Sequence, residues 1–392
     1  MAGRRIRIVV CRMNGSLQIL PVRTARRRRQ FRGFPYAKYA GNPYWVAPLR
    51  TTQAKLFRKK PRFFDRADMA LFLALRAGRV VGRIAAIENR AHNEHYGDKL
   101  GFFGFFECID DDKEAAGGLV DAAGEWLAAR GLQHMRGPVN PSMNSECGLL
   151  IMGFDSPPAI LMPYNPPAYA ALLESAGLRK EKDLIAYDVR IDKMKPGTRV
   201  HSRLSRLVER MHRRYPEVTV RKLDMSSYED EILRFMHVFE EARRQNWGYV
   251  PVREKELLDT ARDMKQIVDP RIVVLAEVDG EPAGVSLSIP DVNLALLGLN
   301  GRLLPFNVFR FLHRLKRLRE CRIFGIASLE KYRHMGITSL LLMHNILWAM
   351  EFGYDRGEAS WVAEDNIRSS RTIEHGLDPV HYKTYRVYRK AL

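Results

Sequence analysis

The stretch EKYRHMGITSLLLMH, from Glu330 to His344, places an arginine, a glycine three residues later and a long apolar run directly after the strand-like segment CRIFGIAS. A strand that passes through a short loop into a helix leaves the first helical N–H groups unpaired, with the positive end of the helix dipole behind them. Such a junction suits an anion, because glycine permits close backbone approach and the arginine adds charge. The sequence therefore predicts a helix from Thr338 to Phe352, capped by Thr338 and preceded by an anion-binding loop that begins at Arg333. An ordinary strand-to-helix turn explains the same residues, so the motif alone leaves both interpretations open.

Length and composition fit a folded protein of two domains. The chain has 392 residues, of which 46% are hydrophobic, and domains of about 200 residues each bury a sizeable core. A formal net charge of +19 indicates an anionic partner, which composition leaves open between nucleic acid, a lipid surface and a phosphorylated cofactor. The cysteines lack the paired spacing of a zinc site or a disulfide framework, so we expect a reducing cytoplasm. No signal peptide or membrane span is expected, because the apolar runs are shorter than the roughly 20 residues that a span requires.

The chain divides near the segment IDKMKPGT, which follows residue 190 and reads as a linker. We expect a basic N-terminal arm over residues 1–34, a first domain over 35–190 and a second over 191–392. Each domain contains a hairpin, a strand, a helix, a strand, a helix that ends in Gly-Leu and a last strand. The hairpins are expected to turn at Ala77-Gly78-Arg79 and at Asp279-Gly280. The repeated order predicts an ancient duplication.

Three motifs near the C-terminus carry a resemblance. They are Arg333-x-x-Gly336-x-Thr338, the segment EDNIRSSRTIEHGL and the final YKTYRVYRK. Together they resemble the second half of the GNAT acyltransferase fold, in which a Q/R-x-x-G-x-G/A loop between the fourth strand and the third helix binds the pyrophosphate of acyl-CoA. Thr338 departs from that pattern. The resemblance implies an α/β protein of two tandem GNAT-like domains, each a mixed, mostly antiparallel twisted sheet flanked by helices.

The resemblance also implies acyl-CoA as a co-substrate of the C-terminal half, with no permanently bound cofactor. The residues implied to bind acyl-CoA are Ile326, Ser328, Arg333, His334, Met335, Gly336, Ile337, Thr338, Asn366 and Arg371. The first half has the acidic DDDKEAAGG at the corresponding place, and three successive aspartates repel a pyrophosphate. We therefore expect the first half to supply scaffold or acceptor surface.

Acyl transfer to an amine needs a base, donors for the oxyanion and an acid for the departing thiolate. The resemblance implies that backbone N–H groups around Ile326 to Ser328 bind the oxyanion. Glu330 is the candidate base, and Tyr382 or Tyr385 on the last strand is the candidate acid. The position that holds an acidic tyrosine in many relatives is occupied by Ile373. A surface glutamate and two packing tyrosines are the alternative.

A second polar segment, GPVNPSMNSECGLL, gathers several functional groups beside a strand, and MPYNPPAY is expected to close over it. Glu146 is the second candidate base, and the candidate substrate-binding residues are Asn140, Asn144, Tyr164 and Asn165. A loop that satisfies its own hydrogen bonds is the alternative. His92 and His95 flank Glu94 without a further evident ligand, so we expect no metal site.

An insertion near residues 291–320 separates the third and fourth strands of the second domain. Its side chains Val308, Phe311, Leu312, Leu315 and Leu318 fall on one helical stripe, with basic residues elsewhere around the helix. The segment VHSRLSRLVERMHRRY repeats this pattern. Cationic amphipathic helices bind anionic membrane surfaces, so we expect a peripheral location on the inner face of the cytoplasmic membrane. Core packing beneath a solvated basic face is the alternative.

Taken whole, with GNPYWVAPL, GRIAAIENRAHNE and GFFGFFEC, the chain is similar to a family of bacterial GNAT-like proteins, one branch of which makes bacterial ceramide. This implies N-acylation of a hydrophobic long-chain amine, most specifically a sphingoid base, by a fatty acyl-CoA. Another amine acceptor, or a catalytically degenerate protein that binds membranes or partners, is the alternative. Nucleic acid is not an expected partner, because the basic helices have few interleaved aromatic residues.

Overall fold

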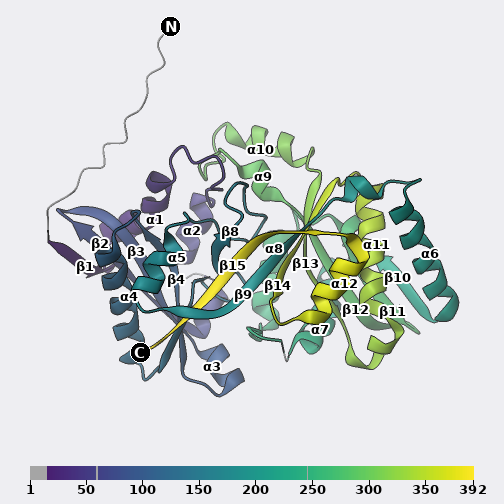
Figure 1. Ribbon diagram of the computed structural model, residues 1–392, viewed down its shortest axis with the longest axis horizontal. Helices are drawn as coiled ribbons and strands as arrows, with labels where there is room; N and C mark the ends of the chain where they lie inside the picture. Colours follow the sequence, from purple (N-terminus) through teal and green to yellow (C-terminus); the bar gives the residue numbers. More distant parts are fainter. Residues whose placement is uncertain (1–15, 59–60, 245) are drawn as a thin grey trace, which may run out of the picture.

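One twisted sheet runs through the computed structural model, which describes residues 16–58, 61–244 and 246–392 (Figure 1). Its strands are β1 Leu17–Pro21, β2 Ala67–Arg76, β3 Arg79–Asn89, β4 Leu100–Cys108, β5 His134–Gly137, β8 Leu149–Met152, β9 Arg179–Val189, β10 Val218–Lys222, β11 Val273–Val278, β12 Glu281–Pro290, β13 Glu320–Ser328, β14 Arg356–Ala363 and β15 Val380–Ala391. They lie in the order β1-β2-β3-β4-β5-β15-β9-β14-β13-β12-β11-β10, with β8 beside β15. Two short strands, β6 Val139–Asn140 and β7 Glu146–Cys147, form a separate pair.

Helices flank the sheet in both halves (Figure 1). They are α1 Ala25–Lys38, α2 Arg50–Phe57, α3 Arg90–Tyr96, α4 Lys113–Ala128, α5 Tyr169–Ser175, α6 Arg199–Arg214, α7 Tyr228–Arg243, α8 Glu254–Met264, α9 Val292–Leu296, α10 Asn307–Leu315, α11 Ile337–Glu351 and α12 Ile367–Leu377. Short 3₁₀ turns cover Arg62–Asp65, Ile191–Met194, Met225–Ser227, Pro270–Ile272 and Glu330–Met335. In the part of the chain that the structure describes, every helix is too short or too polar to cross a bilayer.

The two halves repeat the same order of elements, as the sequence predicts. In each half two hairpin strands, a third antiparallel strand, a long helix and a parallel strand follow one another. The hairpin turns have positive φ at Ala77 (48°), Gly78 (74°), Asp279 (51°) and Gly280 (81°), which is the geometry that matches the twist of paired strands. Both predicted hairpins are confirmed.

The last strand of each half lies against the other half. β9 ends the first half and pairs with β14 of the second, whereas β15 ends the chain and pairs with β5 and β8 of the first. β9 and β15 also pair with each other, so they form the centre of the sheet. Residue 190 thus separates two sequence repeats, but the sheet continues across it.

The predicted basic arm over residues 1–34 is wrong where the structure describes it. From Leu17 the chain forms β1, which pairs with β2, and Thr24 caps α1 by accepting a hydrogen bond from the Arg27 N–H at 3.3 Å. Phe31 of α1 is fully buried. The arginine run therefore covers the outer face of a helix that packs on the sheet, and residues 1–15 lie outside the described residues.

The two basic amphipathic segments differ in how they pack. The apolar side of α6 is in the core, where Leu204 is 2% exposed and packs in one cluster with Leu342 and Ile346 of α11. Core packing beneath a basic face is therefore what the structure shows for α6. The segment around α10 leaves apolar side chains in solvent, as described below.

Candidate active site

One opening in the second half lies between β13 and β14. These parallel strands pair from Glu320–Arg356 to Ile323–Ala359 and then separate. A register shift between Leu287 and Ser288 of β12 accompanies the separation. Beyond it, the facing edges of β13 and β14 no longer pair, and a cavity of about 330 Å³ lies between them. Backbone N–H and C=O groups of a splayed strand edge are free to bind a ligand.

Apolar and hydroxyl side chains share the walls of this cavity. β13 contributes residues 323–326, β14 contributes 359–363, and α11 contributes Thr338 and Leu342. The start of α12 adds Asn366, Ser369, Thr372 and Ile373, and the segment after α7 adds Asn246 and Trp247. Ile373 therefore lines the cavity, and this position offers no hydroxyl for acid catalysis.

The start of α11 is open to an anion. Gly336 precedes the helix with φ 70°, and no side chain caps the first N–H groups. A Cβ at Gly336 would lie 3.2 Å from Cε of Met211. The predicted cap is wrong: Thr338 lies inside the first turn, and its hydroxyl is 2.8 Å from the Ser328 hydroxyl of β13. Because Thr338 is held against the strand, it leaves the helix terminus unoccupied.

The first half has the same opening with a different helix start. β4 and β5 pair in parallel from Leu100–His134 to Phe102–Arg136 and then separate. Asp112 caps α4 by accepting a hydrogen bond from the Ala115 N–H at 3.0 Å, and it also pairs with Arg76 at 2.9 Å. A carboxylate of the protein therefore already occupies the place that an anion would take.

The structure brings together some of the predicted acyl-CoA residues. Ile326, Thr338 and Asn366 line the cavity, and Ser328 touches it through Thr338. Asn366 caps α12 by accepting from the Ser369 N–H at 3.2 Å. The remaining predicted residues lie outside the lining: Arg333, His334 and Arg371 are exposed, Met335 and Ile337 are buried in the core, and Gly336 is in the turn.

The predicted catalytic residues lie apart from this cavity. The Glu330 side chain is 84% exposed and pairs with Arg333 at 3.4 Å. Tyr382 donates to the Glu358 carboxylate behind the cavity wall, and burial raises its pKa. Tyr385 is fully buried, and among the described residues its hydroxyl has no hydrogen-bond partner. β15 points these tyrosines into the contact between the halves, because it pairs with β5 and β8.

A buried network of hydrogen bonds and an ion pair lies where β13 and β14 begin to separate. Arg322 is 1% exposed, and its guanidinium donates to the Ser360 hydroxyl at 2.8 Å and to the Ile160 carbonyl of the first half at 2.6 Å. Glu358 lies 3.9 Å from Arg322 and accepts a hydrogen bond from the Ser360 hydroxyl. Ser360 therefore connects the cavity to a buried carboxylate. The arginine within the apolar strand CRIFGIAS was the sequence signal for this network.

Arg243 brings a positive charge to the cavity wall. Its guanidinium lies 4.5 Å from the Phe239 ring centre, and burial lowers its pKa to about 10. Among the described residues no carboxylate pairs with it. Its position next to the opening depends on how α7 packs on the sheet, so the sequence did not single it out.

The segment after α7 is held by the first half. Asn144 donates to the Val250 carbonyl at 3.1 Å, and Tyr96 donates to the Asn246 carbonyl at 3.3 Å. Met143 packs so closely on Gly248 that a Cβ there would lie 2.7 Å from its Cε. Asn144 therefore lies outside the cavity and instead fixes the segment that brings Trp247 to the wall.

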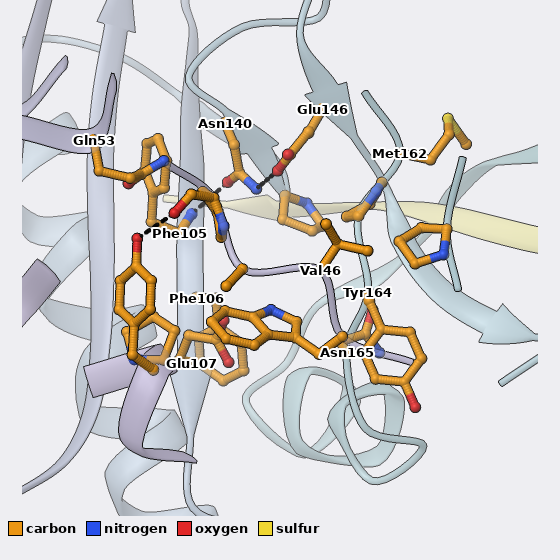
Figure 2. Close-up of a pocket in the computed structure, with 18 of the residues that line it drawn as sticks. Val46, Gln53, Phe105, Phe106, Glu107, Asn140, Glu146, Met162, Tyr164 and Asn165 are labelled. Carbon is orange, nitrogen blue, oxygen red and sulfur yellow. Dashed lines mark hydrogen bonds between the residues drawn. The ribbon is translucent and has the colours of Figure 1, made fainter. Parts of the chain in front are cut away.

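The other predicted polar residues line a second cavity, of about 140 Å³, whose walls come mostly from the first half and also include Asn293 and Leu296 of α9 (Figure 2). Asn140, Glu146, Tyr164 and Asn165 all contribute to its walls. Asn140 donates to Glu146 at 3.1 Å and accepts from the Phe105 N–H at 2.6 Å. Burial raises the pKa of Glu146.

Asn165 accepts a hydrogen bond from the Leu150 N–H at 2.7 Å and donates one to the Leu150 carbonyl at 3.0 Å. This is the pattern expected of a loop whose polar groups bond to one another. β5 and β14 are connected through three antiparallel pairings, β5–β15, β15–β9 and β9–β14, so these two strands run in opposite directions. The two cavities, which lie at the carboxyl ends of β5 and β14, therefore open towards opposite ends of the sheet. Glu146 thus belongs to the other cavity.

Comparisons with known proteins identify the family to which this fold belongs. Residues 233–377 match the acetyltransferase (GNAT) family. Over 389 residues the chain is 37% identical to the bacterial ceramide synthase of Caulobacter vibrioides, covering 97% of this chain and 98% of that protein. The chain belongs to the GNAT family. It is also 31% identical over 372 residues to protein YghO of Escherichia coli, covering 93% of each chain.

A solved tandem GNAT protein from the clavulanic acid biosynthesis pathway has the same architecture. Its TM-score is 0.55 at 10% identity, with 96% of this chain and 98% of that chain covered. The predicted tandem GNAT fold is confirmed. Membership in the GNAT family also supports the predicted acyltransferase class.

Proposed function

We propose that this GNAT protein transfers a fatty acyl group from acyl-CoA to the amine of a hydrophobic acceptor, most specifically a sphingoid base. The observation that carries the proposal is the opening between β13 and β14, which leads to a helix start without a side-chain cap. The relative named bacterial ceramide synthase supports this choice of acceptor, since the similarity extends over nearly the whole chain.

Acyl-CoA fits the opening in one direction. The pyrophosphate would lie at the N-terminus of α11, where N–H groups and the helix dipole favour negative charge. The pantetheine arm would then pass between β13 and β14 along Ile326 and Thr338. The apolar wall formed by Phe324, Leu342 and Trp361 suits a fatty chain.

The chemistry requires the amine to attack the thioester carbon, with the carbon–sulfur bond breaking as the amide bond forms. Backbone N–H groups of the splayed strand edges would stabilise the oxyanion. Ser360 lines the cavity and donates to Glu358, so it offers the amine proton a path to a buried carboxylate. The Arg322 guanidinium lies 3.9 Å from that carboxylate. The CoA thiolate leaves and takes a proton from water or from a cavity hydroxyl.

The test is a reconstitution with the purified full chain. It is incubated with acyl-CoAs of several chain lengths and with long-chain amines that include a sphingoid base, and the lipid products are analysed by mass spectrometry. We expect an N-acyl product together with an equal amount of free CoA. Absence of amide with every pair, under conditions where acyl-CoA binding is measured by calorimetry, would overturn the proposal.

A further inference from the structure

The segment that carries α10 projects large apolar side chains into solvent. Leu304 is 78% exposed, Phe306 77%, Phe309 70% and Leu312 47%. These four residues, here called the apolar tip, include the three most exposed large hydrophobic side chains among the described residues. The sequence-predicted stripe is only partly right, because Val308, Phe311, Leu315 and Leu318 are partly buried against the protein. Leu312 belongs to both the stripe and the tip, whereas Leu304, Phe306 and Phe309 lie outside the stripe.

Exposed basic residues of the same segment, here called the basic rim, lie close to the apolar tip in the sequence. From Val292 to Arg319 the sequence contains six arginine or lysine residues and no aspartate or glutamate. Arg302, Arg310, Lys316 and Arg317 are exposed, and no described carboxylate pairs with any of them. Arg314 is used differently: it donates to the Leu297 carbonyl at 2.7 Å and so fixes α10 to α9.

The segment that carries the tip is attached to the rest of the protein by a hydrogen bond and by apolar packing. The Arg50 N–H donates to the Gly301 carbonyl at 3.0 Å, which ties the segment to the first half. Leu315 and Leu318, at and just beyond the end of α10, pack in one apolar cluster with Ile160 and Phe324. Phe324 also lines the cavity between β13 and β14. Apolar contacts therefore continue from the base of α10 to the wall of the candidate active site.

We propose that the apolar tip inserts into the interface of an anionic phospholipid bilayer while the basic rim binds lipid phosphates. A segment that carries both exposed apolar side chains and exposed cations matches the apolar and charged layers of such a surface. A second copy of the chain is disfavoured as the occupant, since a two-fold contact would bring the same cations together. Membrane binding through the tip stands apart from the proposed reaction and is measured without substrates.

The experiment is co-sedimentation of the full chain with vesicles, without acyl-CoA or amine. Wild-type protein is expected to bind vesicles that contain phosphatidylglycerol and to bind pure phosphatidylcholine weakly. The double variant Phe306→Ser and Phe309→Ser should lower the affinity at least about tenfold, since two aromatic side chains no longer leave water. Val380→Ser, which removes another exposed apolar side chain (58% exposed), is the matched control and should bind like wild type.

Two double charge-reversal variants test whether vesicle binding depends on the basic rim or only on the overall positive charge of the protein. Arg310→Glu with Arg317→Glu should weaken binding strongly, whereas Arg206→Glu with Arg210→Glu on α6 should change it little. All variants should keep the wild-type melting temperature, because every altered side chain is exposed. Equal loss from the α6 variant, or unchanged binding of the Phe306/Phe309 variant, would overturn the proposal. So would a concentration-dependent dimer in light scattering that the tip variant abolishes.

Discussion

The openings at β4/β5 and at β13/β14 are the same feature of a repeated fold, but only one has the charge pattern that suits the proposed acyl-CoA site. In the second half Gly336 precedes a helix whose first N–H groups have no side-chain cap. In the first half Asp112 caps the equivalent helix and also binds Arg76. The parallel ladders differ as well, since the third pair is Arg322–Glu358 in one and Phe102–Arg136 in the other. Backbone architecture creates the opening, and a few side chains decide whether an anionic cofactor is attracted to it.

The largest effect should come from Glu358, the buried carboxylate that accepts a hydrogen bond from Ser360 at the second opening. Glu358→Gln should lower kcat about 100- to 1000-fold, because the amine proton loses its acceptor. KM for acyl-CoA should stay within about twofold of wild type. Steady-state rates of CoA release measure both values. Glu330→Gln is the control: its side chain is 84% exposed, and a comparable loss there would favour Glu330 as the base.

Making the second helix start resemble the first should remove binding of the cofactor. Gly336→Asp places a carboxylate at the α11 terminus and a Cβ at φ 70°, so acyl-CoA affinity should fall about 100-fold. Titration calorimetry with acyl-CoA gives the value. Gly353→Asp imposes a similar backbone strain at the other end of α11, where φ is 84°. That variant should lower the melting temperature and leave affinity unchanged; equal losses in both would mean that strain alone is responsible.

A third prediction concerns the buried carboxylate where the insertion meets the first half. Burial, reinforced by Glu358, raises the pKa of Asp291 to about 7, while its oxygen accepts from the Ile160 N–H at 2.9 Å. The folded protein therefore holds this proton above the pKa of the unfolded chain, and stability declines as pH rises from about 4 to 7.

Asp291→Asn keeps an acceptor oxygen and removes the titration. The decline in the free energy of unfolding between pH 4.5 and 7.5 should shrink by about 2 kcal/mol in urea titrations. Asp110→Asn, whose side chain is exposed and pairs with Lys38, should retain the wild-type slope. A steeper slope in Asp291→Asn would contradict the assignment.

The smallest effect tests the first opening. Asp112→Ala removes the α4 cap and the contact with Arg76, so the free energy of unfolding should fall by about 1 to 2 kcal/mol. Acyl-CoA affinity should not change, since acyl-CoA is proposed to bind in the other opening. Chemical denaturation and calorimetry measure the two quantities. The control Asp121→Ala breaks an exposed ion pair with Lys390 and should lower the free energy of unfolding by less than about 0.5 kcal/mol. A gain of acyl-CoA binding by Asp112→Ala would show that the charge of Asp112 alone prevents binding in the first half.

The sequence predicts well those features that depend on nearby residues. Hairpin turns at Gly78 and Gly280, the helix after Gly336 and the acidic stretch before α4 all follow from local signals. Tyr382 and Tyr385 could not be placed in this way, because the partner of a strand is set by the tertiary fold and β15 pairs across the halves. Arg243 and Trp247 were missed for the same reason: they reach the opening through the packing of α7 and the segment after it.

Because β9 and β15 each pair with strands of the other half, neither half has a complete sheet of its own. Deleting the first half would remove β9 and leave β14 with an unpaired edge beside the active opening. Deleting the end of the chain would strip β5 and β8 in the same way. Each half therefore contributes a strand on which the sheet of the other half depends, so neither half can be removed without exposing strand edges.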